Sequence, residues 1–165
     1  MKLEPNVWFD EVVKTYHLIS PHIHHTQLVT CPDLNEELDG RFLFKPESLQ
    51  ITGSFKVRGA LSAISRLSKD ELKRGVIAYS SGNHAQGVAH AAKVFNTPAT
   101  VVMPIDAPER KIANAKALGA QVIHYDRRTE SREDMSRAIA KEKNLVIINP
   151  YDALETIYGQ GTAAY

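Results

Sequence analysis

Short apolar runs alternate with amphipathic segments along the second half of the chain. Strands are predicted at residues 76–79, 99–103, 122–125 and 145–148, where apolar and β-branched residues stand in a row. Between them, residues 84–95, 107–118 and 131–143 carry their apolar residues on one helical face. Strands that alternate with helices of about a dozen residues indicate βαβ units. We therefore expect an α/β fold with a parallel four-stranded sheet.

The first 74 residues are less regular and contain shorter elements. The pattern predicts an amphipathic helix at residues 7–16, a strand at 42–44 and a helix at 55–67. Ser54 is expected to cap the last of these helices, and Ser68 begins a sequence typical of a capping box. Another helical segment begins near residue 152.

Composition narrows the function classes. The chain has 165 residues, 43% of them hydrophobic, and a net charge of +1, which gives no electrostatic case for binding nucleic acid. One cysteine cannot form an internal disulfide, and no apolar run has the roughly 18–20 residues that a membrane span needs. The N-terminus has no apolar segment typical of a signal peptide. A cytoplasmic location without membrane attachment is the expectation.

Lys56 is the first candidate for chemistry. It stands near the start of the predicted helix, between Phe55 and Val57, with Gly53 and Gly59 allowing other backbone to come close. Partial burial and the positive end of a helix both favour the neutral amine, and only that form attacks an aldehyde. A solvated surface lysine is the ordinary alternative.

The segment Ser80-Ser81-Gly82-Asn83-His84 is the second candidate. It connects a predicted strand to a predicted helix, so its backbone N–H groups and the helix dipole favour a carboxylate or phosphate. It also follows the carboxyl end of a parallel strand, where open α/β folds bind ligands. The alternative is an ordinary turn with Ser or Asn as N-cap. An imine-forming lysine opposite an anion-binding loop suggests pyridoxal phosphate chemistry on an amino acid.

Other sites are less favoured by the residues. His22, His24 and His25 lack a nearby Cys or carboxylate at ligand spacing, so no metal site is predicted. A hydrolase triad of Ser81, His84 and Asp106 would lack the Gly-x-Ser-x-Gly elbow. A Rossmann-like nucleotide-binding module would lack the glycine fingerprint, and residues 159–162 lack the lysine of a P-loop.

Residues 45–60, which include Gly53-Ser54-Phe55-Lys56, resemble the cofactor-attachment segment of threonine dehydratases and serine racemases. These are fold type II, or tryptophan-synthase-β-like, pyridoxal-phosphate enzymes. Residues 80–87 resemble the asparagine loop of that family, and residues 107–111 and 159–162 also fit. The similarity extends in order over nearly the whole chain.

The resemblance implies roles for individual residues. Lys56 would form the imine with the cofactor and then act as acid and base at Cα. Asn83 would bind the phenolic oxygen of the cofactor, and Phe55 would pack beside it. Ser80, Ser81, Gly82, Asn83 and His84 would hold the substrate carboxylate, mainly through backbone amides. Ser81 also matches the second acid/base of the serine racemases, a position that is serine in the dehydratases too.

The resemblance also implies an organisation. Residues 1–74 would be the N-terminal part of the large cofactor domain, residues 75–150 the small α/β domain, and residues 151–165 the return into the large domain. Family members are longer, and their second half supplies the glycine-rich loop for the cofactor phosphate and the residue facing the pyridine nitrogen.

Three functions stay open at this point. The first is an ammonia-lyase that eliminates water from threonine or serine, of which this chain is the N-terminal half. The second is a serine racemase-like enzyme. The third is a non-catalytic fragment, in which Phe55 and the helix at 53–67 would expose apolar surface and favour self-association. For the full-length protein we expect a homo-oligomer.

Overall fold

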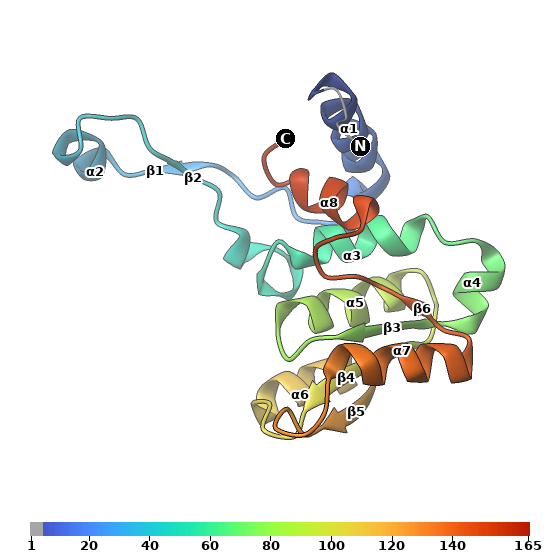
Figure 1. The fold of residues 1–165 in the computed structure, drawn as a ribbon. Helices are drawn as coiled ribbons and strands as arrows, with labels where there is room; N and C mark the ends of the chain where they lie inside the picture. Colours follow the sequence, from blue (N-terminus) through green and yellow to red (C-terminus); the bar gives the residue numbers. More distant parts are fainter. Residues whose placement is uncertain (1–4) are drawn as a thin grey trace.

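A four-stranded parallel sheet forms the centre of the molecule. The computed structural model describes residues 5–165 (Figure 1). Strand order is β5-β4-β3-β6, and every pairing is parallel. The strands are β3 (Val76–Tyr79), β4 (Ala99–Pro104), β5 (Gln121–Tyr125) and β6 (Val146–Ile147). The predicted α/β fold is confirmed, with β6 shorter than its apolar run.

Helices cover both faces of this sheet. α5 (Asn83–Val94) and α6 (Glu109–Ala117) lie on one face, and α7 (Arg132–Lys143) lies on the other (Figure 1). Side chains of a strand alternate between the two faces. Accordingly Val76 and Ala78 join the core beneath α5, whereas Ile77 and Tyr79 join the smaller core beneath α7. Burial on both faces is what makes the strands of this parallel sheet apolar throughout.

Three more helices build outward from α5. α3 (Lys56–Ser65) packs on α5, α8 (Leu154–Gly161) packs on α3, and α1 (Pro5–Ile19) lies against both α8 and α3. The crossing of α3 and α8 is close because glycines face each other: a Cβ built on Gly159 would lie 2.7 Å from the Cα of Gly59. The C-terminal segment therefore returns to the helix that carries Lys56.

An extended arm projects from this body (Figure 1). It consists of the antiparallel pair β1 (Val29–Thr30) and β2 (Leu43–Phe44) with α2 (Pro32–Glu37) between them. Several apolar side chains of the arm, among them Leu38 and Leu43, are exposed. The sequence pattern predicted β2 but not β1 or α2, which are too short to show a period. The remaining elements are η1 (Ser20–His22), η2 (Glu47–Leu49), η3 (Ile51–Gly53) and α4 (Lys69–Arg74).

Local signals at the helix ends were mostly correct. Ser68 and Glu71 form the predicted capping box at α4. Gly119, at φ 91°, follows α6, where its N–H and that of Ala120 bond back to Lys116 and Ala115. The predicted cap at Ser54 differs in detail: Phe55 occupies the N-cap position of α3, while the Ser54 hydroxyl accepts a hydrogen bond from the Lys56 N–H at 3.3 Å. Among the helices of residues 5–165, none is long and apolar enough to cross a membrane.

Candidate functional site

Lys56 is the first residue of α3 and is partly buried. Its Nζ donates a hydrogen bond to the backbone carbonyl of Pro150 at 2.8 Å and lies 5.2 Å from the centre of the Phe55 ring. Burial lowers the pKa of Lys56 below its usual value. The amine is therefore easier to deprotonate than a solvated lysine, as the sequence predicted from its position.

The loop Ser80–Asn83 follows β3 and leads into α5. The Ser80 hydroxyl accepts a hydrogen bond from the Gly82 N–H at 3.1 Å, and Gly82 is the N-cap of α5 without a side-chain capping bond. Neither Ser nor Asn caps this helix, contrary to the ordinary alternative. The first N–H groups of a helix have no intrahelical acceptor, so those of Asn83 and His84 are available for an anion. Ser81 is partly buried, and the Asn83 side chain is exposed.

Gly87 explains how the loop comes close to Lys56. A Cβ at Gly87 would lie 3.1 Å from the backbone nitrogen of Val57 and 3.2 Å from the carbonyl carbon of Lys56. Such distances are tighter than ordinary van der Waals contact, so a side chain at this position would push α5 and the start of α3 slightly apart. The two candidate motifs, 24 or more residues apart in the sequence, therefore meet at the same end of the two helices.

His84 is a buried structural link in this region, with 3% of its surface exposed. Its Nε2 is 2.9 Å from the carbonyl oxygen of Ile148. Burial, opposed by this hydrogen bond, lowers the pKa of His84 to about 4. The ring is consequently neutral near pH 7, with the hydrogen on Nε2, and Nδ1 is buried without a partner among the described residues. Of His84, only the backbone amide is available for the substrate role that the resemblance implies.

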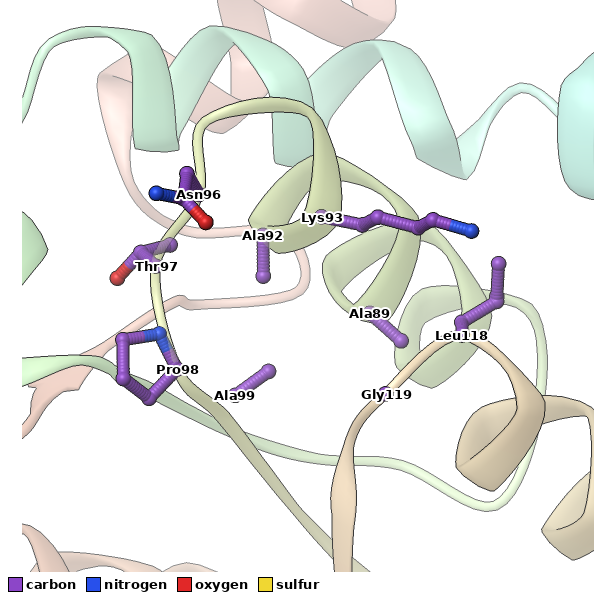
Figure 2. A pocket seen from close by; sticks show the side chains of 9 residues that line it. All are labelled: Ala89, Ala92, Lys93, Asn96, Thr97, Pro98, Ala99, Leu118 and Gly119. Atoms are coloured by element: carbon purple, nitrogen blue, oxygen red, sulfur yellow. The ribbon is translucent and has the colours of Figure 1, made fainter.

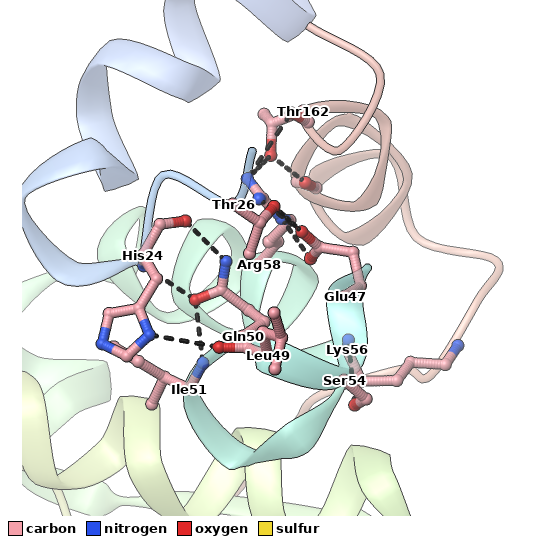
Figure 3. Close-up of polar contacts among 11 residues, drawn as sticks. His24, Thr26, Glu47, Leu49, Gln50, Ile51, Ser54, Lys56, Arg58 and Thr162 are labelled. Atoms are coloured by element: carbon pink, nitrogen blue, oxygen red, sulfur yellow. Dashed lines mark hydrogen bonds and ion pairs between the residues drawn. The ribbon is translucent and has the colours of Figure 1, made fainter. Parts of the chain in front are cut away.

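Arg58 lies two positions along α3 from Lys56, and its side chain points toward Glu47 and Thr162 rather than in the direction of the Lys56 amine (Figure 3). Its guanidinium, 1% exposed, donates to both carboxylate oxygens of Glu47 at 2.7 and 2.8 Å. The Thr26 hydroxyl also donates to Glu47, and the Thr162 hydroxyl accepts from Arg58 at 3.3 Å. This network ties the segment before α3 and the end of α8 to the helix that carries Lys56.

The histidines of the N-terminal region do not converge. Nδ1 of His24 is 3.3 Å from the carbonyl oxygen of Leu49, Nδ1 of His25 is 3.2 Å from the Tyr16 hydroxyl, and His22 packs edge-on against Phe95. Each imidazole thus has its own local partner.

The hydrolase alternative is not supported by the geometry. Asp106 pairs with Arg127 at 2.8 Å, and the Nε2 of His84 is bonded to a backbone carbonyl rather than to Ser81. A nucleophile, a base and an orienting acid are therefore not aligned here.

A cavity of about 330 Å³ lies away from Lys56 (Figure 2). It is lined by the end of α5, by Thr97, Pro98 and Ala99 at the start of β4, and by Gly119. The Ser80–Asn83 loop follows the carboxyl end of β3, whereas this cavity lies near the amino end of β4. Because β3 and β4 are parallel, the loop and the cavity lie at opposite ends of the strands. Its lining combines small and apolar residues with Lys93, Asn96 and Thr97, and it includes no residue of the two candidate motifs.

Comparison with known proteins identifies the family. The sequence profile described as "Pyridoxal-phosphate dependent enzyme" matches residues 19–165. The chain belongs to the pyridoxal-phosphate-dependent enzyme family. Its structural neighbours are fold type II enzymes, as the sequence motifs predicted.

Relatives in this family carry several activities. The chain is 44% identical over 94% of its length to an L-threo-3-hydroxyaspartate ammonia-lyase of Saccharomyces cerevisiae, covering 48% of that protein. It is also 44% identical over 94% of its length to a serine racemase of Schizosaccharomyces pombe, again covering 48%. A solved threonine deaminase of Solanum lycopersicum is 34% identical with a TM-score of 0.89, over 98% of this chain and 47% of that one. The chain thus spans about half the length of these relatives.

The residues present fit pyridoxal 5'-phosphate, the cofactor of this pyridoxal-phosphate family. Lys56 offers a partly buried amine whose lowered pKa favours the unprotonated form that attacks an aldehyde. Asn83 and Phe55 stand at the start of α5 and immediately before α3, the two helices that meet at Lys56. These three side chains therefore suit the part of the cofactor that carries its aldehyde group.

The sequence did not predict three residues that lie around Lys56 and the Ser80–Asn83 loop. Pro150 supplies the carbonyl that Lys56 binds, and Gln160 donates to the same carbonyl at 3.0 Å. The ammonium of Lys111 lies 3.6 Å from the position of a Cβ on Gly82, which adds positive charge beside the loop. Lys111 and Gln160 stand in segments that carry the family resemblance, which was the one available signal. Their contacts depend on the tertiary structure.

Proposed function

We propose that this chain supplies the lysine and the substrate loop of a pyridoxal-phosphate-dependent ammonia-lyase that acts on a β-hydroxy amino acid, threonine or serine. The product would be a 2-oxo acid and ammonia after loss of water. The observation that carries the proposal is the close contact at Gly87 between α5, which follows the Ser80–Asn83 loop, and the start of α3, which carries the partly buried Lys56. The activities named for the relatives support the same chemical class.

The loop would orient the substrate. Backbone N–H groups at the start of α5 would bind the carboxylate, assisted by the nearby ammonium of Lys111. The Ser80 hydroxyl already holds the Gly82 N–H, so the loop is ordered before a substrate arrives. Such preorganisation would place the Cα–H bond without further ordering of the backbone.

Lys56 would move the proton at Cα. When bound, pyridoxal phosphate supplies an electron sink for the negative charge that develops at Cα. Lys56 Nζ would hold the cofactor when no substrate is bound and would remove the Cα proton of a bound substrate as a neutral base. Its lowered pKa suits that role, because a base with a pKa nearer neutrality is more often unprotonated. Asn83 and Phe55 would also hold the cofactor.

Ser81 would have a further role in the alternative, a serine racemase-like enzyme. A serine racemase needs a second acid/base on the other face of Cα, and the Ser81 hydroxyl is partly buried in the loop. The serine racemase relative is as similar as the hydroxyaspartate lyase, which is the observation that favours this second candidate.

The test uses the full-length protein with pyridoxal phosphate. Three forms are compared: wild type, Lys56→Ala and, as a control at an exposed lysine, Lys93→Ala. L-threonine, L-serine and L-threo-3-hydroxyaspartate would be supplied separately, and 2-oxo acid and D-serine would be measured. We expect 2-oxo acid from threonine or serine in wild type and Lys93→Ala, and none in Lys56→Ala. D-serine as the main product, reduced in Ser81→Ala, would favour the racemase instead. Unchanged turnover in Lys56→Ala would overturn both.

The non-catalytic alternative is tested with the 165-residue chain. Phe55 is 39% exposed, but the helix behind it is buried at Val57, Ala60 and Leu61. The predicted exposure of this helix is therefore wrong, and only Phe55 adds apolar surface there. Titration with pyridoxal phosphate, followed by absorbance, and sedimentation of the same samples separate the cases. Stoichiometric binding that is lost in Lys56→Ala would contradict the fragment hypothesis, whereas no binding by wild type would support it.

A further inference from the structure

The carbonyl of Pro150 accepts hydrogen bonds from two side chains on different helices. Lys56 Nζ at the start of α3 donates at 2.8 Å, and Gln160 Nε2 near the end of α8 donates at 3.0 Å. Pro150 is buried, and both hydrogen bonds are partly buried. Because a carbonyl oxygen has two lone pairs, it can accept both hydrogen bonds at once.

This carbonyl is held in place by its neighbours. The Ile148 carbonyl accepts from His84 at 2.9 Å, and the Asn149 carbonyl accepts from the Thr156 hydroxyl at 2.9 Å. Three consecutive carbonyls after β6 are therefore each bound by a side chain of α5, α3 or α8. The Pro150 oxygen is consequently a fixed point rather than part of a mobile loop.

Gln160 is itself fixed against α3. A Cβ at Gly59 would lie 3.0 Å from Gln160 Cγ and 3.1 Å from its Nε2, so the side chain rests on the helix about one turn after Lys56. The amide reaches Pro150 from this position. Its placement depends on the close crossing of α3 and α8.

We propose that Gln160 is a positioning residue for Lys56: by sharing the Pro150 carbonyl, it defines where the free amine rests and limits how strongly that carbonyl binds the protonated form. The inference rests on the proposed role of Lys56 as the imine-forming amine. It concerns the stages in which the amine is joined to neither cofactor nor substrate. A carbonyl that already accepts one N–H has less negative potential for an ammonium, and the Gln160 N–H dipole points its positive end at the same oxygen.

Few other charged groups act on the pKa of Lys56. Burial is the cause of the lowered pKa of Lys56, and on α5 the titratable group that interacts with it is His84, which is neutral near pH 7. On α3 and the segment before it, Arg58 and Glu47 pair with each other. Removal of the Gln160 amide should therefore act on Lys56 through the Pro150 carbonyl.

The test measures the reactivity of Lys56 in the free chain, without cofactor. Acetylation at increasing pH, with the Lys56 peptide quantified by mass spectrometry, gives the pH at which the amine becomes reactive. Gln160→Met keeps the size of the side chain and removes the donor. We expect its Lys56 to become reactive at higher pH, so that at a fixed pH below the midpoint labelling is about three- to tenfold slower, as a rise of roughly half to one pK unit requires.

Two further variants make the outcome decisive. Thr156→Val removes the equivalent bond to the adjacent carbonyl and should leave the Lys56 pH profile unchanged. Gln160→Glu places a carboxylate beside the ammonium and should slow labelling more than Gln160→Met, which keeps the test valid where the methionine variant does not fold. Equal profiles in wild type and both Gln160 variants, or the same shift in Thr156→Val, would refute the proposal. This measurement reads the acetylation of Lys56 and not ammonia-lyase activity. A failure of the proposed function would therefore show in the activity assay and not in this one.

Discussion

The close crossing of α3 and α8 leads to a sharp stability prediction at Gly159. A Cβ there would lie 2.5 Å from the Arg58 carbonyl oxygen, 2.6 Å from Ser62 Cβ and 2.7 Å from Gly59 Cα. Carbon atoms pack best at about 3.5–4.0 Å, so Gly159→Ala creates overlaps of about 1 Å with atoms that cannot rotate away. α8 must move outward to accommodate the methyl group.

The magnitude follows from two opposing effects. Overpacking in a well-packed core costs about 1–3 kcal/mol, and overlap with backbone places this site near the upper value. Alanine in place of glycine returns about 1 kcal/mol of helix propensity. The net destabilisation is then about 2 kcal/mol. For a chain of this size that corresponds to a fall in Tm of about 4–8 °C.

Thermal unfolding followed by circular dichroism and urea unfolding would check the value. The matched control is Gly161→Ala in the same helix, where the new Cβ would meet the side chain of Val12 at 2.9 Å rather than backbone. Val12 can shift, so a loss below about 1 kcal/mol is expected there. A Gly159→Ala variant as stable as wild type, or a control equally destabilised, would contradict the argument.

Three other variants test the polar groups of the fold. Glu47→Gln leaves the buried guanidinium of Arg58 without its counterion and should cost about 3–5 kcal/mol in urea unfolding. The pKa of Glu47 is lowered by its hydrogen bonds and by the charge of Arg58, against the opposing effect of burial. The Glu47 carboxylate therefore stabilises the folded chain above pH 4.5, its pKa in the unfolded chain, and this contribution is lost as the pH falls below that value. In Glu47→Gln the free energy of unfolding should decrease less steeply with falling pH in this range. An unchanged pH dependence would contradict this. Folding lowers the pKa of His84 from 6.5 to about 4, so between these pH values the unfolded chain binds a proton that the folded chain does not. The free energy of unfolding should therefore decrease by about 3 kcal/mol as the pH falls from 6.5 to 4. In His84→Gln that decline should largely disappear in urea titrations across this range, and its persistence would assign the slope to other groups. Ser68→Ala should cost about 1 kcal/mol by removing one half of the α4 capping box, measured by thermal unfolding, and no loss of stability would show that the exposed cap contributes little.

The regular second half was predictable because its signals are local. The run at 76–79 has no polar residue since β3 is buried on both faces, and Val88, Ala91 and Ala92 repeat at helical spacing because α5 covers the sheet. Lys56 and the Ser80–Asn83 loop were found the same way, from flanking glycines and from the change of period between strand and helix. The family followed from those motifs.

The arm and the polar network were not predictable by such reasoning. β1 and α2 have 2 and 6 residues, too few for a period to appear. Arg58 is among the least exposed residues, although arginine is rarely fully buried, because Glu47 supplies a partner 11 positions away. A pattern of single residues contains no information about such pairs.

The sequence by itself determined the helices and strands of the second half, and it predicted Lys56 as the reactive amine and the loop at residues 80–83 as an anion-binding site. These depend on propensity, periodicity and residue type within a few positions. Only the tertiary structure decided what Lys56 contacts. Its amine rests on the carbonyl of Pro150, 94 residues away, because Gly87 lets α5 approach α3 and Gly59 and Gly159 let α8 do the same. A backbone carbonyl is identical at every residue, so packing alone selects which one an amine meets.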